Sequence, residues 1–272
     1  MSRSLPSSLF RAVLLASLFF AVEASLLAGN VKVRFAEGLT RGFLTVSDAS
    51  GKHIGDGDLD QLVKGNRVSD HFVLRFKDGS RYDDTAVFTQ DGVFHLLTDH
   101  LIEHGSAFKG AMETDIDTVK GQVTVRYKDA HGNDKTRSKQ MELPSDLANG
   151  ILYILVKDMN PNAGPTTVSY LAATPEPRLV KLIFTREGKD AFATGTVRRD
   201  AEHYVVHVDI GGLTGAVARL IGKQPPNTDM WVIGGEAPTF AGSSGPLDGN
   251  GGFWKISLVS PALAELSATP PH

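Results

Sequence analysis

The sequence predicts a mainly β protein: one antiparallel, strongly curved sheet of about a dozen strands with two helices, forming an open or half barrel. Short runs of alternating apolar and polar residues recur along the chain, separated by turn signals about every ten residues, which is typical of an antiparallel meander. The regular strand–helix alternation of a parallel sheet is missing, and the strand count exceeds that of a small closed barrel. A two-sheet β-sandwich is the alternative.

The first 24 residues have the features of a secretory signal peptide. Arg11 precedes an apolar run from Ala12 to Val22. The small residues Val22 and Ala24 occupy the positions before the cleavage site that a signal peptidase recognises. We expect cleavage after Ala24, with Ala28 as the second choice. The run has 11 residues, against the roughly 20 needed to cross a bilayer, although an uncleaved anchor is the alternative. These features predict a periplasmic or secreted bacterial protein with no integral membrane segment after cleavage.

Composition excludes several classes of protein. The net charge of −3, with both signs interspersed, lacks the basic stripe that neutralises nucleic-acid phosphates. The chain has no cysteine, so it has no disulfide, thiolate metal site or cysteine nucleophile. Its stability must therefore rest on a hydrophobic core, which a single domain over residues 25–262 is large enough to form. Residues 263–272 are expected to be a flexible tail.

The first half of the expected domain reads as strand after strand. Asp78-Gly79 and Asp91-Gly92 are strong two-residue hairpin signals between alternating runs. The polar stretch from Ala130 to Lys139 is expected to be a hairpin tip. The strands predicted in this half are Val31–Phe35, Phe43–Val46, Phe72–Lys77, Tyr82–Gln90, Val93–Glu103, Ala111–Val119 and Gln122–Lys128.

A central helix is predicted between Leu143 and Pro161. Pro144 ends the preceding strand, Ser145 is placed to cap the first turn, and Asn160 with Pro161 stops the helix. Apolar residues spaced four apart give the helix a broad apolar face, which we expect on the concave side of the sheet. There they would line a groove for a ligand, or equally complete a filled core. The groove candidates are Leu147, Ile151, Leu152, Leu155 and Met159.

The second half resumes the meander. A second, shorter helix is predicted from Leu213 to Ile221, and a Gly-rich loop from Gly234 to Gly252. The predicted strands are Thr167–Ala172, Leu179–Arg186, Ala191–Arg198, Tyr204–Ile210, Met230–Ile233 and Phe253–Leu258.

Three stretches resemble an uncharacterised family of exported bacterial β-rich proteins. They are Phe76–Thr85, Leu143–Gly150 and Gly211–Trp231, the last containing Gly-Lys-Gln-Pro-Pro from Gly222. The resemblance implies a β-rich fold loosely similar to the periplasmic half-barrels of the lipoprotein-carrier type. The family has no established activity, so the resemblance implies no catalytic residue.

One polar cluster, His95, Asp99, His100, Glu103 and His104, is the candidate for metal binding or acid–base chemistry. On a regular strand, His95, Asp99 and Glu103 would share one face and the other two histidines the opposite face. Metal ligands must converge on one ion at about 2.0–2.2 Å. The expected split therefore predicts no metal site, and we expect no cofactor.

Two other acidic stretches have simpler interpretations. Asp56, Asp58 and Asp60 start with the spacing of a calcium loop, but Gln61 and Arg67 occupy the positions where the loop needs Gly and Glu. We expect these aspartates to keep a strand edge soluble. Arg81 to Asp84 contains two adjacent carboxylates, which a strand would direct to opposite faces, so a hairpin ion-pair cluster is the interpretation there.

The glycines before the second predicted helix are the candidates for anion binding. Gly212 and Gly215 could present free amides to a phosphate or carboxylate, with Lys223 nearby. No dinucleotide fingerprint accompanies them, and close packing at a strand–helix corner is the alternative.

Together these patterns favour an exported, non-enzymatic protein that binds a lipid or other hydrophobic molecule in the concave face of its sheet. One alternative is an envelope structural or interaction module with a filled core, which would bind a protein partner through strand edges or the Gly234–Gly252 loop. The other is a hydrolase that uses the His/Asp cluster, which requires those side chains to meet in one concave site.

Overall fold

The computed structural model describes residues 29–194, 197–211, 225–247 and 251–259. These residues form a single antiparallel sheet of fourteen strands and one short helix, which confirms the mainly β prediction and not the sandwich alternative. The strand bounds are β1 Thr40–Asp48, β2 His53–Lys64, β3 Arg67–Phe76, β4 Arg81–Asp91, β5 Val93–His104, β6 Met112–Asp117, β7 Gln122–Lys128, β8 Asp134–Gln140, β9 Thr166–Ala172, β10 Arg178–Thr194, β11 Val197–Asp209, β12 Thr228–Ile233, β13 Thr239–Pro246 and β14 Phe253–Val259. The predicted signal peptide, second helix and tail lie outside the described residues.

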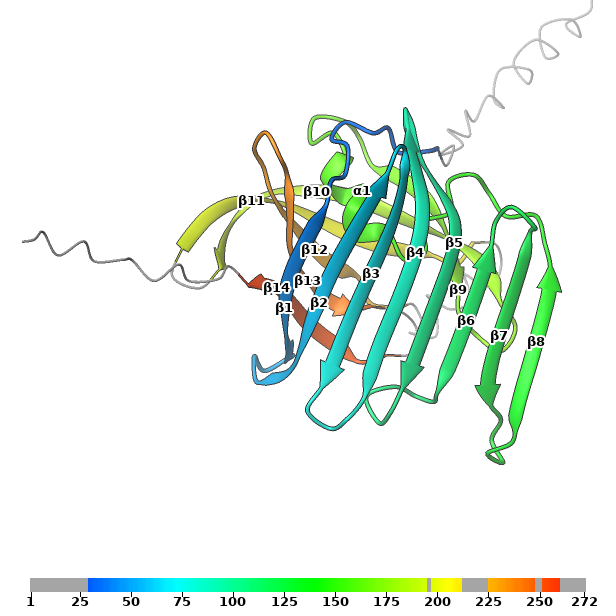
Figure 1. The fold of residues 1–272 in the computed structure, drawn as a ribbon. Helices are drawn as coiled ribbons and strands as arrows, with labels where there is room; N and C mark the ends of the chain where they lie inside the picture. Colours follow the sequence, from blue (N-terminus) through cyan, green and yellow to red (C-terminus); the bar gives the residue numbers. More distant parts are fainter. Residues whose placement is uncertain (1–28, 195–196, 212–224, 248–250, 260–272) are drawn as a thin grey trace, which may run out of the picture.

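The strand order makes an open barrel. It runs from β8 through β7, β6, β5, β4, β3 and β2 to β1, then through β14, β13, β12, β11 and β10 to β9, so the sheet does not close between β8 and β9. Figure 1 shows β1–β5 as a curved wall, with helix α1 (Leu152–Asp158) behind it and β6–β8 continuing to one side. The helix contacts β12 and β13 on the opposite wall.

The inner face of the sheet carries most of the core, because alternate residues of each strand are buried. On β3 the side chains Val68, Phe72, Leu74 and Phe76 are buried on the inner face, and Asp70 stands among them. The residues that alternate with them are partly or fully exposed, except Val73, which is buried as well. The inner face is therefore apolar with a few buried acids, which sets the chemistry of the interior.

Strand β2 was not among the predicted strands. Its first half is rich in glycine and aspartate, which are depleted in strands. Glycine is needed here because the backbone of β3 lies very close to β2. A Cβ on Gly55 or Gly57 would lie 2.4–2.5 Å from a backbone carbonyl oxygen of β3. The intervening aspartates face outward and form ion pairs, including Asp58 with Arg75 and Asp60 with Arg41.

The Gly-rich loop predicted from Gly234 to Gly252 contains strand β13, so that prediction is wrong in its central part. The strand consists largely of small residues and pairs with β12 on one side and β14 on the other. A Cβ on Gly242 would lie 2.4 Å from the carbonyl oxygen of Ile256 and 3.0 Å from the Phe192 ring. Tight packing of β13 against its neighbouring strands therefore requires small residues, and a run of small residues in a sequence is typical of a loop.

Two polar segments also differ from expectation. The predicted hairpin tip from Ala130 to Lys139 is a turn followed by the exposed edge strand β8, which pairs with β7. The predicted strand Val31–Phe35 is only an isolated bridge between Lys32 and Val93. Its backbone is engaged elsewhere, because Phe35 N donates to Asp158 Oδ1 at 2.8 Å.

The central helix is much shorter than the predicted Leu143–Pro161. It covers Leu152–Asp158, and Ile151 rather than Ser145 is its N-cap. Gly150, with φ of +71°, breaks any continuous helix at this point. The apolar spacing of four seen in the sequence continues through residues that are not helical.

The residues before Gly150 instead cover the free edge of β9. Ala148 N donates to Ser169 O and Ser169 N to Asp146 O, which extends the ladder by one parallel bridge. The amide of Asn149 then bonds both backbone groups of Leu171, at 2.8 and 3.0 Å. This turn, residues 146–151, protects the edge strand and fixes where α1 begins.

Candidate functional site

A cavity of about 470 Å³ lies between α1 and the inner faces of the sheet. Side chains from α1 and from β3, β9, β10, β12 and β13 line it, and they are mainly apolar. Leading members of the lining are Phe72, Leu152, Tyr170, Leu182, Met230 and Phe240. The turn before α1 contributes Gly150, so the same segment that covers β9 also forms one wall of the cavity.

Three charged side chains stand in this lining among the described residues. Asp84 projects from β4 and is buried, whereas Lys109 and Arg178 are exposed. The cavity therefore has a buried acid in its wall and two solvated cations at exposed positions. Tyr82 also lines the cavity, and its hydroxyl donates to Asp84 Oδ2 at 3.2 Å.

Asp84 forms a carboxyl pair with Asp99 of the neighbouring strand. The two side chains are close enough for each carboxyl group to influence the other, and Asp99 is 3% exposed. Burial, followed by the charge of Asp84, raises the pKa of Asp99 well above its ordinary value. Two neighbouring buried carboxyl groups disfavour two negative charges, so protonation of Asp99 is favoured.

The turn before α1 packs directly on this pair. A Cβ on Gly150 would lie 2.3 Å from Asp99 Oδ1 and 3.4 Å from Asp84 Oδ1. Only glycine combines this approach with a positive φ. The backbone at Gly150 therefore separates Asp99 from the cavity and leaves Asp84 as the acid that lines it.

A third interior acid anchors the helix. The Tyr153 hydroxyl of α1 donates to Asp70 Oδ2 of β3. Burial raises the pKa of Asp70 well above its usual value, the polar side chain of Gln61 nearby opposes this, and the charge of Asp84 adds to it. The interior face of β3–β5 is thus acidic, in a region where desolvation favours the protonated form.

Asp158 closes the other end of α1. Its Oδ1 accepts hydrogen bonds from the backbone N–H groups of Arg34 and Phe35, at 2.5 and 2.8 Å. Burial raises its pKa to about 6, and these two hydrogen bonds act in the opposite direction. Lys157, beside it, forms an ion pair with Glu37 at 2.7 Å. The helix is therefore tied to the N-terminal segment by polar contacts.

The predicted groove residues fall into two groups. Leu152 lines the cavity, whereas Leu147, Ile151, Leu155 and Met159 are at most 4% exposed and belong to the packed core. The short helix therefore both fills the core and presents two side chains, Leu152 and Tyr153, to the cavity. The anion-site candidates Gly212, Gly215 and Lys223 lie outside the described residues.

The His/Asp cluster is divided by a β-bulge in β5. Val87 of β4 pairs with Thr98 and Phe88 with Leu96, so Leu97 is an extra residue in the ladder. The bulge shifts the alternation, and the expectation that His95 shares a face with Asp99 is wrong. Before it, buried Phe94 and Leu96 face inward; after it, Asp99, Leu101 and Glu103 do. The three histidines of this strand, His95, His100 and His104, therefore lie on the outer face.

The histidines make separate contacts there. His95 Nδ1 lies 3.2 Å from the carbonyl oxygen of Ser145, and His100 Nδ1 lies 2.7 Å from Asp115 Oδ1. Because Asp99 and Glu103 lie on the inner face, the arrangement that the hydrolase hypothesis requires does not form from this cluster.

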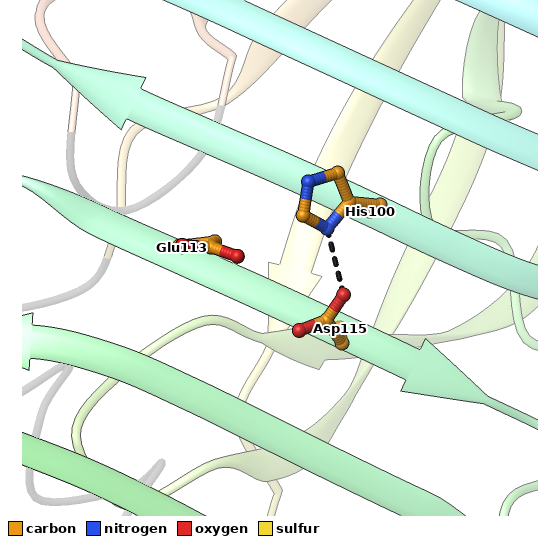
Figure 2. Close-up of side chains that lie close together, drawn as sticks. All are labelled: His100, Glu113 and Asp115. Atoms are coloured by element: carbon orange, nitrogen blue, oxygen red, sulfur yellow. Dashed lines mark hydrogen bonds and ion pairs between the residues drawn. The ribbon is translucent and has the colours of Figure 1, made fainter.

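His100 does meet two other acids on the outer face. Figure 2 shows His100, Glu113 and Asp115 side by side on β5 and β6, with ligand atoms within 4.8 Å of one another. Such a set could hold a divalent cation. However, Arg126 of β7 already bonds Asp115 and Glu113, the latter at 2.9 Å. The arrangement is that of an ion-pair cluster in which the guanidinium neutralises both carboxylates.

Asp83 and Asp84 separate as expected for adjacent strand residues. Asp83 faces outward, where it pairs with His71 at 2.7 Å and with Arg81. The inner-face acid near Asp84 is Asp99, which lies diagonally across the strands because Asp84 pairs with Leu101 and Ala86 pairs with Asp99. Sequence reasoning missed this pair of acids. A signal was present: Tyr82, Asp84, Ala86 and Phe88 alternate as one face, so an acid stands at a position whose neighbours are apolar.

Comparisons with known proteins do not show a family for this chain. No protein-family model and no curated protein matches the chain. Among solved structures, a β-barrel-like protein of the domain of unknown function DUF1849 from Brucella abortus is similar, with 10% sequence identity and a TM-score of 0.43. The match covers 81% of this chain and 94% of that one. Within the described ranges, no helix is long and apolar enough to cross a membrane.

Proposed function

We propose that the protein binds a hydrophobic small molecule or acyl chain in the cavity beneath α1. The observation that carries this proposal is the apolar cavity of about 470 Å³, lined by the helix and the inner sheet face. Ligand sites in proteins usually measure roughly 300–1,000 Å³ and are mostly apolar with a few polar groups. This cavity meets both criteria, and its buried lining residues with polar groups are Asp84, Tyr82, Tyr153 and Ser243.

Packing energetics support the same proposal. Protein interiors are close-packed, and an empty apolar cavity costs stability because its lining loses van der Waals contacts. Beside well-packed residues such as Phe184 and Ile154, the lining of this partly open apolar cavity would gain such contacts if a hydrophobic ligand filled it. The signal peptide expected from the sequence would place this binding site in the periplasm.

The proposal is tested by blocking the cavity. Ala172 of β9 lines it and is only partly buried, so Ala172→Trp would fill space without entering the packed core. We expect an uncharged fluorescent probe, N-phenyl-1-naphthylamine, to bind the native chain, and the variant to bind it at least about tenfold more weakly because the indole occupies the site.

Ala130→Trp is the matched control, since Ala130 is exposed in the turn between β7 and β8 and does not line the cavity. It should bind the probe as the native chain does. Failure of the native chain to bind the probe, or equal binding by the Ala172→Trp chain, would overturn the proposal and favour a filled core.

A further inference from the structure

The lining of the cavity is positively charged where it meets solvent. Lys109, in the loop between β5 and β6, and Arg178, the first residue of β10, are both exposed and both line the cavity. A lining residue that is also exposed lies where the cavity opens to water, so we call these two side chains the cationic rim. The third charged residue of the described lining, Asp84, is buried in the wall. Positive charge therefore stands at the opening, and the acid stands inside.

The corner between β9 and β10 forms part of this opening. Residues 173–175 of the corner belong to the lining, and Glu176 follows them directly. Glu176 Oε1 lies 3.5 Å from Nε of Arg137 on β8. This ion pair spans the gap between β8 and β9, across which the sheet does not close. The free edge of the sheet at β8 therefore lies beside the opening of the cavity.

Strand β8 adds positive charge on the inner face. Arg137 pairs across the ladder with Val125 of β7, which is fully buried. Residues opposite each other on neighbouring strands project from the same face of a sheet, so Arg137 projects from the inner face. Lys135 and Lys139, two residues away on either side, share that face, and Lys135 pairs with Asp129 at 3.4 Å. The edge strand beside the opening thus presents a row of three cations.

Arg178 is the cation best placed to bind an anionic group at the opening. Arg137 is paired with Glu176, whereas Arg178 has no ion-pair partner within the described ranges. A guanidinium carries five N–H donors in a planar fork that matches the geometry of a carboxylate or a phosphate. A cleft lined by charge of one sign also raises the local concentration of ligands of the opposite sign.

The apolar interior decides which way round an amphiphile can enter. Burying a charged group without a partner is costly, so the head group of an amphiphile stays at the opening while its apolar chain occupies the cavity. A negative head group that entered further would also meet the buried acid Asp84. At the opening, a negative head group meets Lys109 and Arg178 instead.

We propose that the ligand is an anionic amphiphile, with a carboxylate or phosphate head group against Lys109 and Arg178 and an acyl or alkyl chain in the cavity. This inference rests on the proposed function and specifies the class of its ligand. A fatty acid and a phosphate ester of a long-chain alcohol share this chemistry.

The test compares ligands that have the same twelve-carbon chain: dodecanoate, dodecyl phosphate, dodecanol and dodecylamine. Each displaces the fluorescent probe from the native protein at neutral pH, below its micelle concentration. We expect dodecanoate to bind at least about tenfold more tightly than dodecylamine, because the cationic rim attracts one head group and repels the other. Dodecanol should fall between them. Tighter binding of dodecyl phosphate than of dodecanoate would assign a phosphate head group, and the reverse order a fatty acid.

Arg178→Gln removes the positive charge at the rim and keeps a polar side chain. We expect this variant to prefer dodecanoate over dodecylamine by less than about threefold, while its affinity for dodecanol changes less than about twofold. Arg67→Gln is the matched control, because Arg67 is likewise exposed at the first position of its strand, β3, and does not line the cavity. This control should retain the native preference.

Salt provides a second measurement on the native chain. The cations of the rim are exposed, and at 1 M sodium chloride the Debye length is only about 3 Å. The preference for dodecanoate should therefore shrink to less than about threefold at this salt concentration, whereas dodecanol should bind no more weakly, because its contacts are mainly apolar.

The outcomes separate the two proposals. If dodecylamine binds the native chain as tightly as dodecanoate, or if the preference is unchanged in Arg178→Gln or in high salt, the anionic inference is overturned while the cavity remains a hydrophobic site. If none of the four ligands binds, the proposed function fails with it. Because the comparisons on the native chain need no variant, the inference stays testable even if Arg178→Gln does not fold.

Discussion

Gly150 determines how closely the turn before α1 approaches the acid pair. Its positive φ and its contacts with Asp99 and Ala86 each exclude a larger residue. The sequence shows only a glycine inside an apolar repeat, which is why the predicted helix ran through it. The requirement comes from side chains on two other strands, and local sequence patterns do not contain that information.

Gly150→Ala should destabilise the protein by about 3 kcal/mol or more, because a left-handed residue costs roughly 1–2 kcal/mol and the methyl group would also collide with Asp99 Oδ1. Gly92→Ala is the matched control. Its φ of +67° is similar, but nothing lies within 4 Å of the added methyl group, so only the backbone cost should appear. Urea denaturation measures both. Equal losses would show that Gly150 is not closely packed against the pair.

The turn of residues 146–151 acts as a substitute strand along β9. Asn149 bonds both backbone groups of Leu171, and the bond from Ser169 Oγ to Asp146 Oδ1 is 2.6 Å. An edge strand is thereby covered on one side without an additional strand. Because the same turn lines the cavity, the stability of the edge and the shape of the site depend on each other.

Asn149→Ala should therefore lower the free energy of unfolding by about 2–3 kcal/mol, because it removes the side chain that bonds the buried backbone N–H and C=O of Leu171. The amide of Leu171 should also exchange with solvent hydrogen much faster. Asn160→Ala is the control, because Asn160 makes an exposed contact with the backbone of Asn162 and its loss should cost less than about 0.5 kcal/mol. Unchanged exchange at Leu171 would contradict this account of the edge.

At the element scale, alternation predicted most strands and failed where packing between strands selects unusual residues. Tyr82–Gln90 and Gln122–Lys128 were predicted within one residue of β4 and β7. Strands β2 and β13 were missed because close approach between neighbours requires glycine. The bulge at Leu97 leaves no local signal either, yet it decides that Asp99 and Glu103 face the interior. Regular alternation along β5 therefore could not predict that Asp99 lies near Asp84 on the inner face.

The whole molecule carries several buried acids whose protonation is favoured by folding. Burial raises the pKa of Asp158 to about 6, and raises those of Asp70 and Asp99. A raised pKa in the folded state contributes stability that is fully present below the unfolded value of about 4 and is lost as pH rises through the folded pKa. Acids with lowered pKa, such as Asp117, act in the opposite direction, but only below about pH 4.

We therefore expect the free energy of unfolding to be larger at pH 5 than at pH 8, by on the order of 2 kcal/mol. Denaturant titrations at a series of pH values measure this dependence. Asp158→Asn should flatten the part of the profile near pH 6, because the amide keeps a hydrogen-bond acceptor for Arg34 and Phe35 and does not titrate. A profile that rises from pH 5 to pH 8 would contradict the assignment of these acids as buried and protonated.

We propose that the open barrel, its covered edge and its apolar cavity together serve to hold a hydrophobic ligand. The measurement that tests this most directly is native mass spectrometry of the protein purified from the cells that produce it, followed by organic extraction of the bound material. We predict one small molecule per chain, with an apolar body that fits the cavity, released on denaturation. A chain found only at the mass of its polypeptide, with nothing in the extract, would contradict the account.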